Sequence, residues 1–224
     1  MKGSFSHQLE RILPRYAVLP LAASVVLNSA VYYGGRLLAA GRRHFDLSTD
    51  LDRLLPFVPA FIVIYVLSFA FWIVGYLVIG RESRSVCFEV LAAEQISKLF
   101  CLVFFVVLPT TMIRPPVLSD GFLYDLTRLI YRLDAPDNLF PSIHCLESWF
   151  CFRGAMKCKK VNRPYRIFCL VAALLVFTST ILVKQHVLAD VLGGVAAAEL
   201  GLFLSRKIGA GKLYVFIERK WMVS

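Results

Sequence analysis

Residues 166–205 read RIFCLVAALLVFTSTILVKQHVLADVLGGVAAAELGLFLS, two long apolar runs joined by the short polar segment Lys184-Gln185-His186. Each run is close to the roughly 20 apolar residues that an α-helix needs to cross the hydrocarbon core of a bilayer. The stretch therefore predicts two membrane-spanning helices, with a histidine at the junction where the chain meets water.

Four more apolar segments extend this pattern over the rest of the chain. The predicted spans are residues 14–32, 56–79, 93–113, 142–157, 166–184 and 187–205. The fourth is the least apolar because it contains Glu147 and Arg153. The chain is 58% hydrophobic, against about 45–50% in soluble domains. We therefore expect an all-α polytopic membrane protein, a six-helix bundle that forms a single domain over residues 1–224.

The segment before the fourth span has a different pattern. Its apolar residues recur at helical spacing, at Leu118, Phe122, Leu126, Leu129, Ile130 and Leu133. Charged residues separate them, which predicts an amphipathic helix over 118–133 that lies in the membrane interface. A turn is expected at 134–138, DAPDN, and Ser142 is expected to cap the helix that carries His144.

The net charge of +10 admits two interpretations, a nucleic-acid partner or the topology of a membrane protein. No basic patch is interleaved with aromatic residues in the way that nucleic-acid sites require. With six spans, 16 Lys and Arg lie on one side of the membrane and 8 on the other, and Lys98 lies within a span. The excess of positive charge predicts cytoplasmic termini, so His144 and His186 would face the outside.

Other polar residues in the apolar segments have structural interpretations. The six cysteines form no Cys-x-x-Cys pair, and we expect them to be buried as small hydrophobic residues rather than to form disulfides or a zinc site. Glu147 lies one turn after His144 and is expected to face the bundle, since a carboxylate facing lipid is costly. Lys98 is expected to extend to the cytoplasmic headgroups.

His186 and Asp190 are four residues apart, a spacing that brings two side chains onto one face of an α-helix. A carboxylate paired with one imidazole nitrogen fixes the tautomer and leaves the other nitrogen free as a nucleophile. The chain crosses twice between His144 and His186, so both should return to the same side. His144 is then a candidate general acid for a leaving alkoxide. The alternatives are a structural His–Asp contact and a satisfied interfacial histidine.

A phosphate group would also need positive charge and hydrogen-bond donors. Arg114 follows the third span on the same side, and its guanidinium suits bidentate contact with phosphate. Ser142 could add a hydroxyl, and Lys184 and Ser179 lie near His186 in the sequence. The alternatives are interfacial anchoring for Arg114, contact with lipid headgroups for Lys184, and a hydrogen bond within its own helix for Ser179.

Three groups of residues together resemble the motifs of the type-2 phosphatidic acid phosphatase superfamily, the lipid phosphate phosphatases. They are Arg114-Pro115, Pro141-Ser142-Ile143-His144, and Ser179 with His186-x-x-x-Asp190. The resemblance covers the chain from about the third span to the sixth and implies a mechanism without a metal or cofactor. It implies that His186 attacks phosphorus and forms a phosphohistidine, that Asp190 orients it, and that His144 protonates the leaving alcohol. Arg114 and Ser142 would hold phosphate oxygens.

Three positions depart from the family's pattern. Val107 stands where the family usually has Lys, Ile143 where it has Gly, and Thr180 where it has Arg. Two cationic phosphate ligands are therefore missing, and Lys184 is a hypothetical replacement for one of them. With the bulky Ile143 before the histidine, the second motif resembles that of the branch that contains inositol phosphorylceramide and sphingomyelin synthases. These enzymes pass a phospho-headgroup to an alcohol.

The sequence thus predicts hydrolysis of a lipid phosphate or pyrophosphate, of the phosphatidate, phosphatidylglycerol phosphate or isoprenyl pyrophosphate type. A headgroup transferase is one alternative, and a non-catalytic lipid-binding membrane protein is another. The expected partners are the lipid substrate and the bilayer of the cell membrane, with no nucleic acid and no cofactor.

Overall fold

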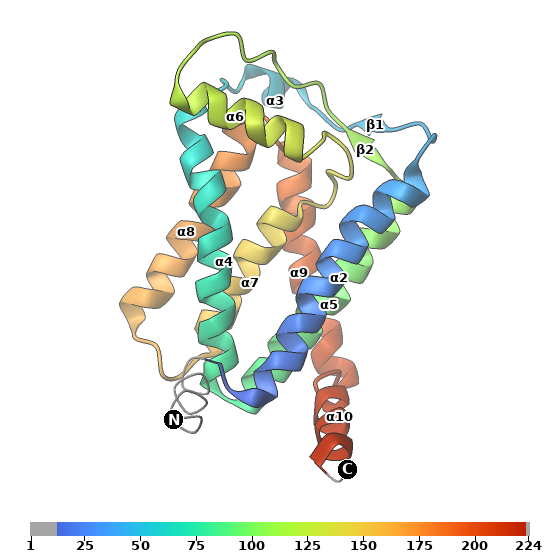
Figure 1. Cartoon of the computed structure of the whole chain (residues 1–224), viewed down its shortest axis with the longest axis vertical. Helices are drawn as coiled ribbons and strands as arrows, with labels where there is room; N and C mark the ends of the chain where they lie inside the picture. The colour runs from blue at the N-terminus through green and yellow to red at the C-terminus, as the bar shows by residue number, and fades with distance from the viewer. Residues whose placement is uncertain (1–12, 223–224) are drawn as a thin grey trace, which may run out of the picture.

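The computed structural model describes residues 13–222 and is a bundle of helices (Figure 1). The helices are α2 (Arg15–Ala39), α3 (Asp50–Leu54), α4 (Ile62–Glu82), α5 (Arg84–Val107), α6 (Phe122–Leu133), α7 (Ile143–Lys157), α8 (Arg163–Leu182), α9 (Leu188–Ile208) and α10 (Lys212–Met222). A 3₁₀ turn, Pro59–Phe61, precedes α4. The two-residue strands β1 (Phe45–Asp46) and β2 (Thr110–Thr111) pair in parallel and join two loops at one end of the bundle. The expected all-α class is confirmed.

Five helices of the described chain are long and apolar enough to cross a membrane, so the protein is a multi-pass membrane protein. They are α2, Pro59–Glu82 with α4, α5, α8 and α9. The expected fourth span forms α7, which has only 15 residues. At 1.5 Å per residue α7 is about 22 Å long, shorter than a hydrocarbon core of about 30 Å. It packs against α4, α5, α8 and α9 in the middle of the bundle.

The expected bounds of the third span, 93–113, are wrong at both ends. Helix α5 begins nine residues earlier, where the Ser83 side chain accepts a hydrogen bond from the Val86 N–H at 3.3 Å. Glu94 and Lys98, near the middle of α5, are buried inside the bundle rather than exposed to lipid. Lys98 pairs with Glu94 and Glu147. The expectation that Lys98 reaches the headgroups is therefore wrong, and the inward orientation of Glu147 is confirmed.

The remaining spans are close to their predicted bounds, with one clear extension. Helix α2 continues to Ala39, beyond the predicted 14–32. Its last two turns remain helical and lead into the loop that carries β1. Helices α8 and α9 begin and end within three residues of the predicted positions. Helix α4 begins at Ile62, six residues after the predicted start at 56, because the 3₁₀ turn precedes it.

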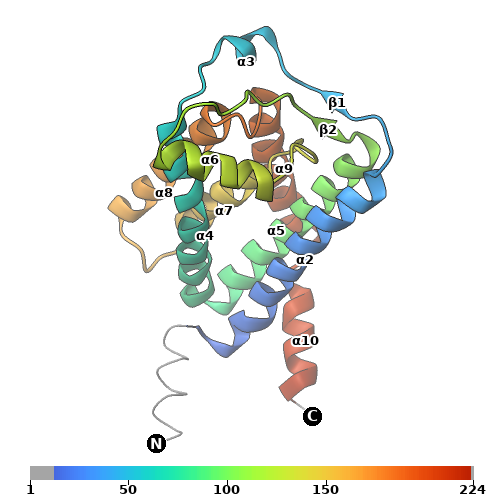
Figure 2. The same cartoon turned by 45° about the horizontal axis from the view of Figure 1, so that its top comes forward.

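Helix α6 runs across one end of the bundle, above α7 (Figures 1 and 2). It begins at Phe122 rather than at Leu118, after Gly121 with a φ of 121°. Such a φ suits glycine, which has no Cβ. Leu123, Leu126 and Ile130 pack against the start of α4 and the end of α8. The expected amphipathic helix is therefore present and closes the end of the bundle where the two histidines lie.

Helix α9 comes close to its neighbours through small residues, as its glycines and alanines predict. A Cβ added at Gly201 would lie 2.0 Å from Ser97 Oγ, and one at Gly194 would lie 2.5 Å from the Ser142 carbonyl oxygen. The six cysteines are free and buried, as expected. The close approach at Gly194 brings the first turns of α9 beside the start of α7.

Candidate active site

His186 lies in the segment that leads into α9, and a carboxylate of the first turn holds it. His186 Nδ1 and Asp190 Oδ2 are 3.2 Å apart, and the Val187 N–H donates to the same oxygen at 3.0 Å. Asp190 is fully buried. Because Asp190 occupies Nδ1, Nε2 is the nitrogen of this ring that is available for chemistry. The predicted i, i+4 pairing is therefore present.

His144 lies in the first turn of α7, and aromatic rings surround it. The Tyr65 ring stacks on it with centroids 4.6 Å apart and an angle of 29°, and the Trp72 centroid is 5.2 Å away. Its Nε2 is buried and has no hydrogen-bond partner within residues 13–222. The centroids of His144 and His186 are 5.7 Å apart. The expectation that the two histidines return to the same end of the bundle is confirmed.

Backbone contacts between α7 and α9 fix this separation. The Ser142 N–H donates to the Asp190 carbonyl oxygen at 3.0 Å. The Ser142 hydroxyl oxygen accepts from the Cys145 N–H at 3.3 Å, so Ser142 is the predicted N-cap of α7. Its side chain is fully buried. The hydroxyl thus has a structural partner already.

A cavity of about 390 Å³ exposes both histidines. The rest of its wall is formed by aromatic, apolar, amide and acidic residues: Asn28, Tyr32, Tyr33, Tyr65, Phe69, Trp72, Ile130, Leu133, Asp134, Asp137, Asn138, Leu139 and Ile143. It lies beneath α6, between α2, α4 and α7. The imidazoles are therefore accessible to a ligand but are surrounded by low-polarity rings, where electrostatic interactions are stronger than in water.

Arg114 lies beside this cavity and is held by residues of three segments. One of its terminal nitrogens donates to the Asp134 carbonyl oxygen at 2.6 Å, and the other contacts Gln185 Oε1. The guanidinium carbon lies 4.7 Å from the centre of the Tyr131 ring. Its Nε is buried without a hydrogen-bond partner in the described chain. The guanidinium therefore lies next to the residue that precedes His186, and its Nε–H is among the donors without a partner in the described chain.

Lys184 is directed elsewhere. Its Nζ donates to the carbonyl oxygens of Asp52 and Leu55, at 2.9 and 2.7 Å. Asp52 Oδ1 in turn accepts from the Leu188 N–H at 2.7 Å. These contacts attach the α3 loop to the start of α9. The structure does not bring the Lys184 ammonium to the histidines.

Ser179 is also occupied within its own helix. Its hydroxyl donates to the Val176 carbonyl oxygen at 2.7 Å, and the side chain is fully buried. The alternative given for it, a hydroxyl bonded to its own helix, describes what is observed. Of the predicted phosphate-binding residues, Arg114 and Ser142 therefore lie nearest to the histidines, and Lys184 and Ser179 are engaged by other groups.

The positions that depart from the family pattern have distinct environments. The Thr180 carbonyl oxygen accepts from the N–H groups of Gln185 and His186, at 2.9 and 3.0 Å. Thr180, in the last turn of α8, thus holds the histidine through the backbone. Val107 is 68% exposed at the end of α5. Neither side chain supplies a charge to the cavity.

Asp134 is the site residue that the sequence did not reveal. Its carboxylate accepts from the hydroxyls of Tyr32 and Tyr65, at 2.8 and 2.9 Å. Burial raises the pKa of Asp134, but the charges of His144 and His186 and the two tyrosine hydrogen bonds outweigh burial and lower it. The carboxylate is therefore ionised at neutral pH. The only sequence signal was its place in the turn 134–138.

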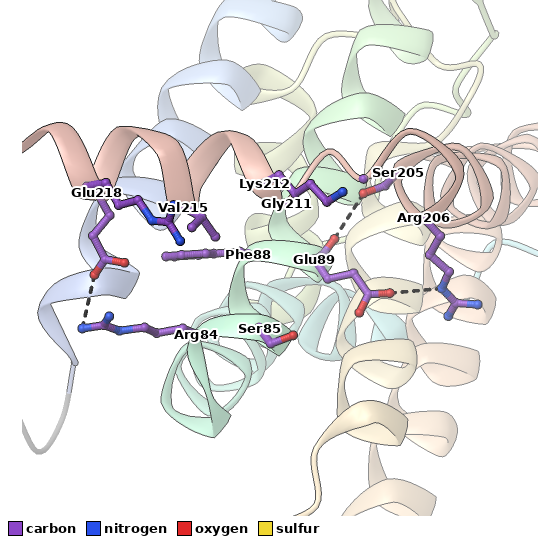
Figure 3. A pocket seen from close by; sticks show the side chains of 12 residues that line it. Arg84, Ser85, Phe88, Glu89, Ser205, Arg206, Gly211, Lys212, Val215 and Glu218 are labelled. Atoms are coloured by element: carbon purple, nitrogen blue, oxygen red, sulfur yellow. Dashed lines mark hydrogen bonds and ion pairs between the residues drawn. The ribbon is translucent and has the colours of Figure 1, made fainter.

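A further cavity, of about 620 Å³, lies at the other end of the bundle between α5, α9 and α10 (Figure 3). Four of the charged residues that line it form ion pairs. Arg84 lies 3.4 Å from Glu218, and Arg206 lies 3.1 Å from Glu89. This cavity contains no histidine. Nucleophilic chemistry therefore belongs to the cavity beneath α6.

The chemistry of the site depends on imidazole and guanidinium groups. No group of three or more His, Cys, Asp and Glu side chains suited to a metal ion occurs among residues 13–222. Two imidazoles, one oriented by a carboxylate and one beside a buried anion, can act as nucleophile and as acid or base. A neighbouring guanidinium can stabilise developing negative charge.

Comparisons with known proteins agree with this arrangement. The model of the PAP2 superfamily matches residues 98–211, which include Arg114, both histidines and Asp190. Searches of curated proteins and of solved structures gave no match. The family model spans just over half of the chain and supports phosphatase-type chemistry on lipid phosphates in general. The protein therefore belongs to the PAP2 superfamily.

Proposed function

We propose that this protein hydrolyses a phosphate or pyrophosphate monoester of a membrane lipid, without a metal, through a phosphohistidine at His186. The observation that carries the proposal is the pair of imidazoles 5.7 Å apart in one cavity, of which only His186 has a carboxylate at Nδ1. This difference supports His186 as the nucleophile and His144 as the residue that transfers protons.

In the first step, His186 Nε2 attacks phosphorus as the bond to the lipid oxygen breaks. Protonated His144 gives its proton to the leaving alkoxide, so the lipid departs as a neutral alcohol. Positive charge develops on the His186 ring, and the Asp190 carboxylate stabilises it. Arg114 stabilises the phosphoryl oxygens, because positive charge directed at the transferring group is a large part of such catalysis.

In the second step, neutral His144 accepts a proton from water as the water oxygen attacks the phosphohistidine. The P–N bond breaks, inorganic phosphate leaves, and the electron pair returns to His186. Both imidazoles then have their initial protonation states. The carboxylate of Asp134, held between two tyrosines near His144, offsets part of the cost of protonating this buried imidazole.

We assign this reaction to the outer face of the cell membrane, with both chain termini in the cytoplasm. The distribution of Lys and Arg supports this orientation, because 16 lie on the side of the termini and 8 on the side of the histidines. Cysteine labelling tests the assignment, since the six native cysteines are buried. A membrane-impermeant maleimide should label Ser119→Cys in intact cells and Lys159→Cys only after lysis. The reverse pattern would contradict the orientation.

The decisive test of the reaction is phosphate release by purified protein in EDTA. The panel contains phosphatidate, phosphatidylglycerol phosphate and farnesyl pyrophosphate, each with and without an added lipid alcohol. Release without the alcohol supports hydrolysis. Loss of all activity in EDTA would contradict the metal-free mechanism, and transfer to the alcohol without phosphate release would identify a transferase.

A further inference from the structure

A second cavity in the membrane-spanning part of the bundle lies next to the cavity of the histidines. It has a volume of about 350 Å³ and lies between α2 and α4, with α5 and α7 behind it. Asn28, Phe69 and Trp72 line both cavities, so the two are adjacent through a shared wall. At its rim, Val25 is 68% exposed and Ile73 is 63% exposed. The cavity therefore opens sideways, toward lipid.

Buried charged residues line the inner side of this cavity. Glu94 is fully buried, Lys98 is 2% exposed and Glu147 is 5% exposed. The Lys98 ammonium contacts both carboxylates, at 2.8 Å for Glu147 Oε1. Ser24 donates to Glu94 and Tyr76 donates to Glu147. Ionisable residues at such a depth are costly, and they are generally retained for a function.

The hydrogen-bonding capacity of this cluster is unequal. Lys98 has three N–H donors, and three acceptors take them: Glu94, Glu147 and the Ser24 carbonyl oxygen at 3.1 Å. A carboxylate can accept about four hydrogen bonds, and each of the two accepts two of the contacts described here. The Asn28 Oδ1 atom is also buried without a partner in the described chain. The cluster thus has spare acceptors, and its ammonium has no spare donor.

The position of the cluster relative to the histidines matches the dimensions of a lipid phosphate. Glu147 follows His144 by three residues on α7, which is about 4.5 Å along the helix axis. With the phosphorus at His186, the atoms two or three bonds beyond the ester oxygen would lie at this depth. The apolar rim between α2 and α4 would then receive the hydrocarbon chains.

We infer that the α2/α4 cavity is the subsite for the polar backbone of the substrate, and that it selects lipid phosphates with a hydroxyl or amide N–H near the phosphate ester. This inference rests on the proposed function. The carboxylates of Glu94 and Glu147 accept hydrogen bonds from the backbone of the lipid. A second phosphate does not suit this subsite, because two carboxylates face one ammonium and all three N–H donors of that ammonium are in use.

The test compares four lipids that share the phosphate and differ in donors. Ceramide 1-phosphate carries a hydroxyl and an amide, lysophosphatidate carries a hydroxyl, and phosphatidate and farnesyl phosphate carry neither. We expect wild-type kcat/KM to be about tenfold higher for the first two, the effect of one or two hydrogen bonds to a charged acceptor. A preference for lysophosphatidate identifies the hydroxyl as the recognised group, and a preference for ceramide 1-phosphate alone identifies the amide.

Glu94→Gln and Glu147→Gln should reduce this preference about tenfold while farnesyl phosphate hydrolysis changes little. The matched control is Glu199→Gln, because Glu199 also lies on a spanning helix but pairs with Arg153 at 3.0 Å, away from the cavity. A wild-type enzyme with no preference would overturn the inference. So would variants that lower the rates for all four lipids equally, since that result describes a purely structural cluster.

A binding measurement separates the inference from the proposed reaction. Monoolein and farnesol, which carry no phosphate, are titrated against the protein, and the tryptophan fluorescence is recorded, since Trp72 lies in the shared wall. Tighter binding of monoolein that Glu147→Gln removes would support the subsite even if no phosphate were released. Equal affinity for both alcohols would reject the subsite even if hydrolysis were observed.

Discussion

His144 in the first turn of α7 and His186 just before α9 lie at the same end of the bundle, but the two histidines have different surroundings. Asp190 pairs with His186 Nδ1 at 3.2 Å. The rings of Tyr65 and Trp72 surround His144, whose Nε2 has no hydrogen-bond partner in the described chain. A carboxylate suits a ring that becomes positively charged on phosphorylation, and an unpaired nitrogen suits proton transfer. In the proposed mechanism, two residues of the same type therefore have different roles because their neighbours differ.

The substitution His186→Ala should have the largest effect. It removes the nucleophile, so phosphate release should fall on the order of 10⁴-fold or more, and no acid-labile phosphoenzyme should form. Quench-flow with a radiolabelled lipid phosphate measures both quantities. If this variant formed a labelled phosphoenzyme, the nucleophile would be a residue other than His186. The different roles proposed for His144 and His186 would then be wrong.

His144→Ala should lower the rate by about 10²- to 10⁴-fold, the usual contribution of a general acid or base. A substrate with a good leaving group, such as p-nitrophenyl phosphate, needs no acid in the first step. The variant should therefore accumulate phosphohistidine on His186 with this substrate, visible as a burst of nitrophenol. A steady rate without a burst would indicate that His144 does not act in the second step.

Gly194→Ala tests the packing that holds the two histidines together. The added Cβ would lie 2.5 Å from the Ser142 carbonyl oxygen and 3.2 Å from the Leu146 nitrogen, so backbone must move. A displacement of about 1 Å can cost about 10²-fold in rate. Gly193→Ala is the matched control, since its Cβ would meet only the movable Phe140 ring, at 2.4 Å. Equal activities of the two variants would contradict this account.

Asp134→Asn should reduce kcat about tenfold, because it weakens the hydrogen bonds of two tyrosines, one of which stacks on His144. The protonated imidazole also loses a neighbouring anion, so the alkaline limb of the pH–rate profile should move to lower pH. Asp125→Asn, an exposed residue of α6 paired with Arg128, is the control. A lower rate with an unmoved pH profile would mean that Asp134 has only a structural role.

Lys184→Ala should have the smallest effect on catalysis, about threefold or less in kcat/KM, because its ammonium binds the carbonyl oxygens of the α3 loop. The loss of two hydrogen bonds should lower the melting temperature instead. The opposite result would be a KM for the lipid phosphate that rises more than about tenfold while the melting temperature stays unchanged. That result would identify Lys184 as a phosphate ligand.

The parts of the fold and site that the sequence predicted depend on local spacing. The apolar runs gave the helices, the four-residue separation gave the His186–Asp190 pair, and Ser142 gave the N-cap of α7. The contacts of Asp134 and the contact between Lys98 and Glu147 could not be predicted in this way. Asp134 meets Tyr32 and Tyr65 across 102 and 69 residues of sequence. The partners of Lys98 include Glu147 on another helix, so no hydropathy pattern reveals that it is buried.

The short length of α7 affects the free-energy cost of bringing a lipid phosphate to the site. The helix begins beneath α6 rather than at the level of its neighbours' ends (Figure 1). Lifting a lipid out of its leaflet exposes hydrocarbon at a cost of about 0.8 kcal/mol for each methylene. A histidine recessed at the start of a 15-residue helix allows the phosphate to reach the protein by lateral diffusion. The hydrocarbon chains of the proposed lipid substrate then remain among their neighbours, and the cost of extraction is avoided.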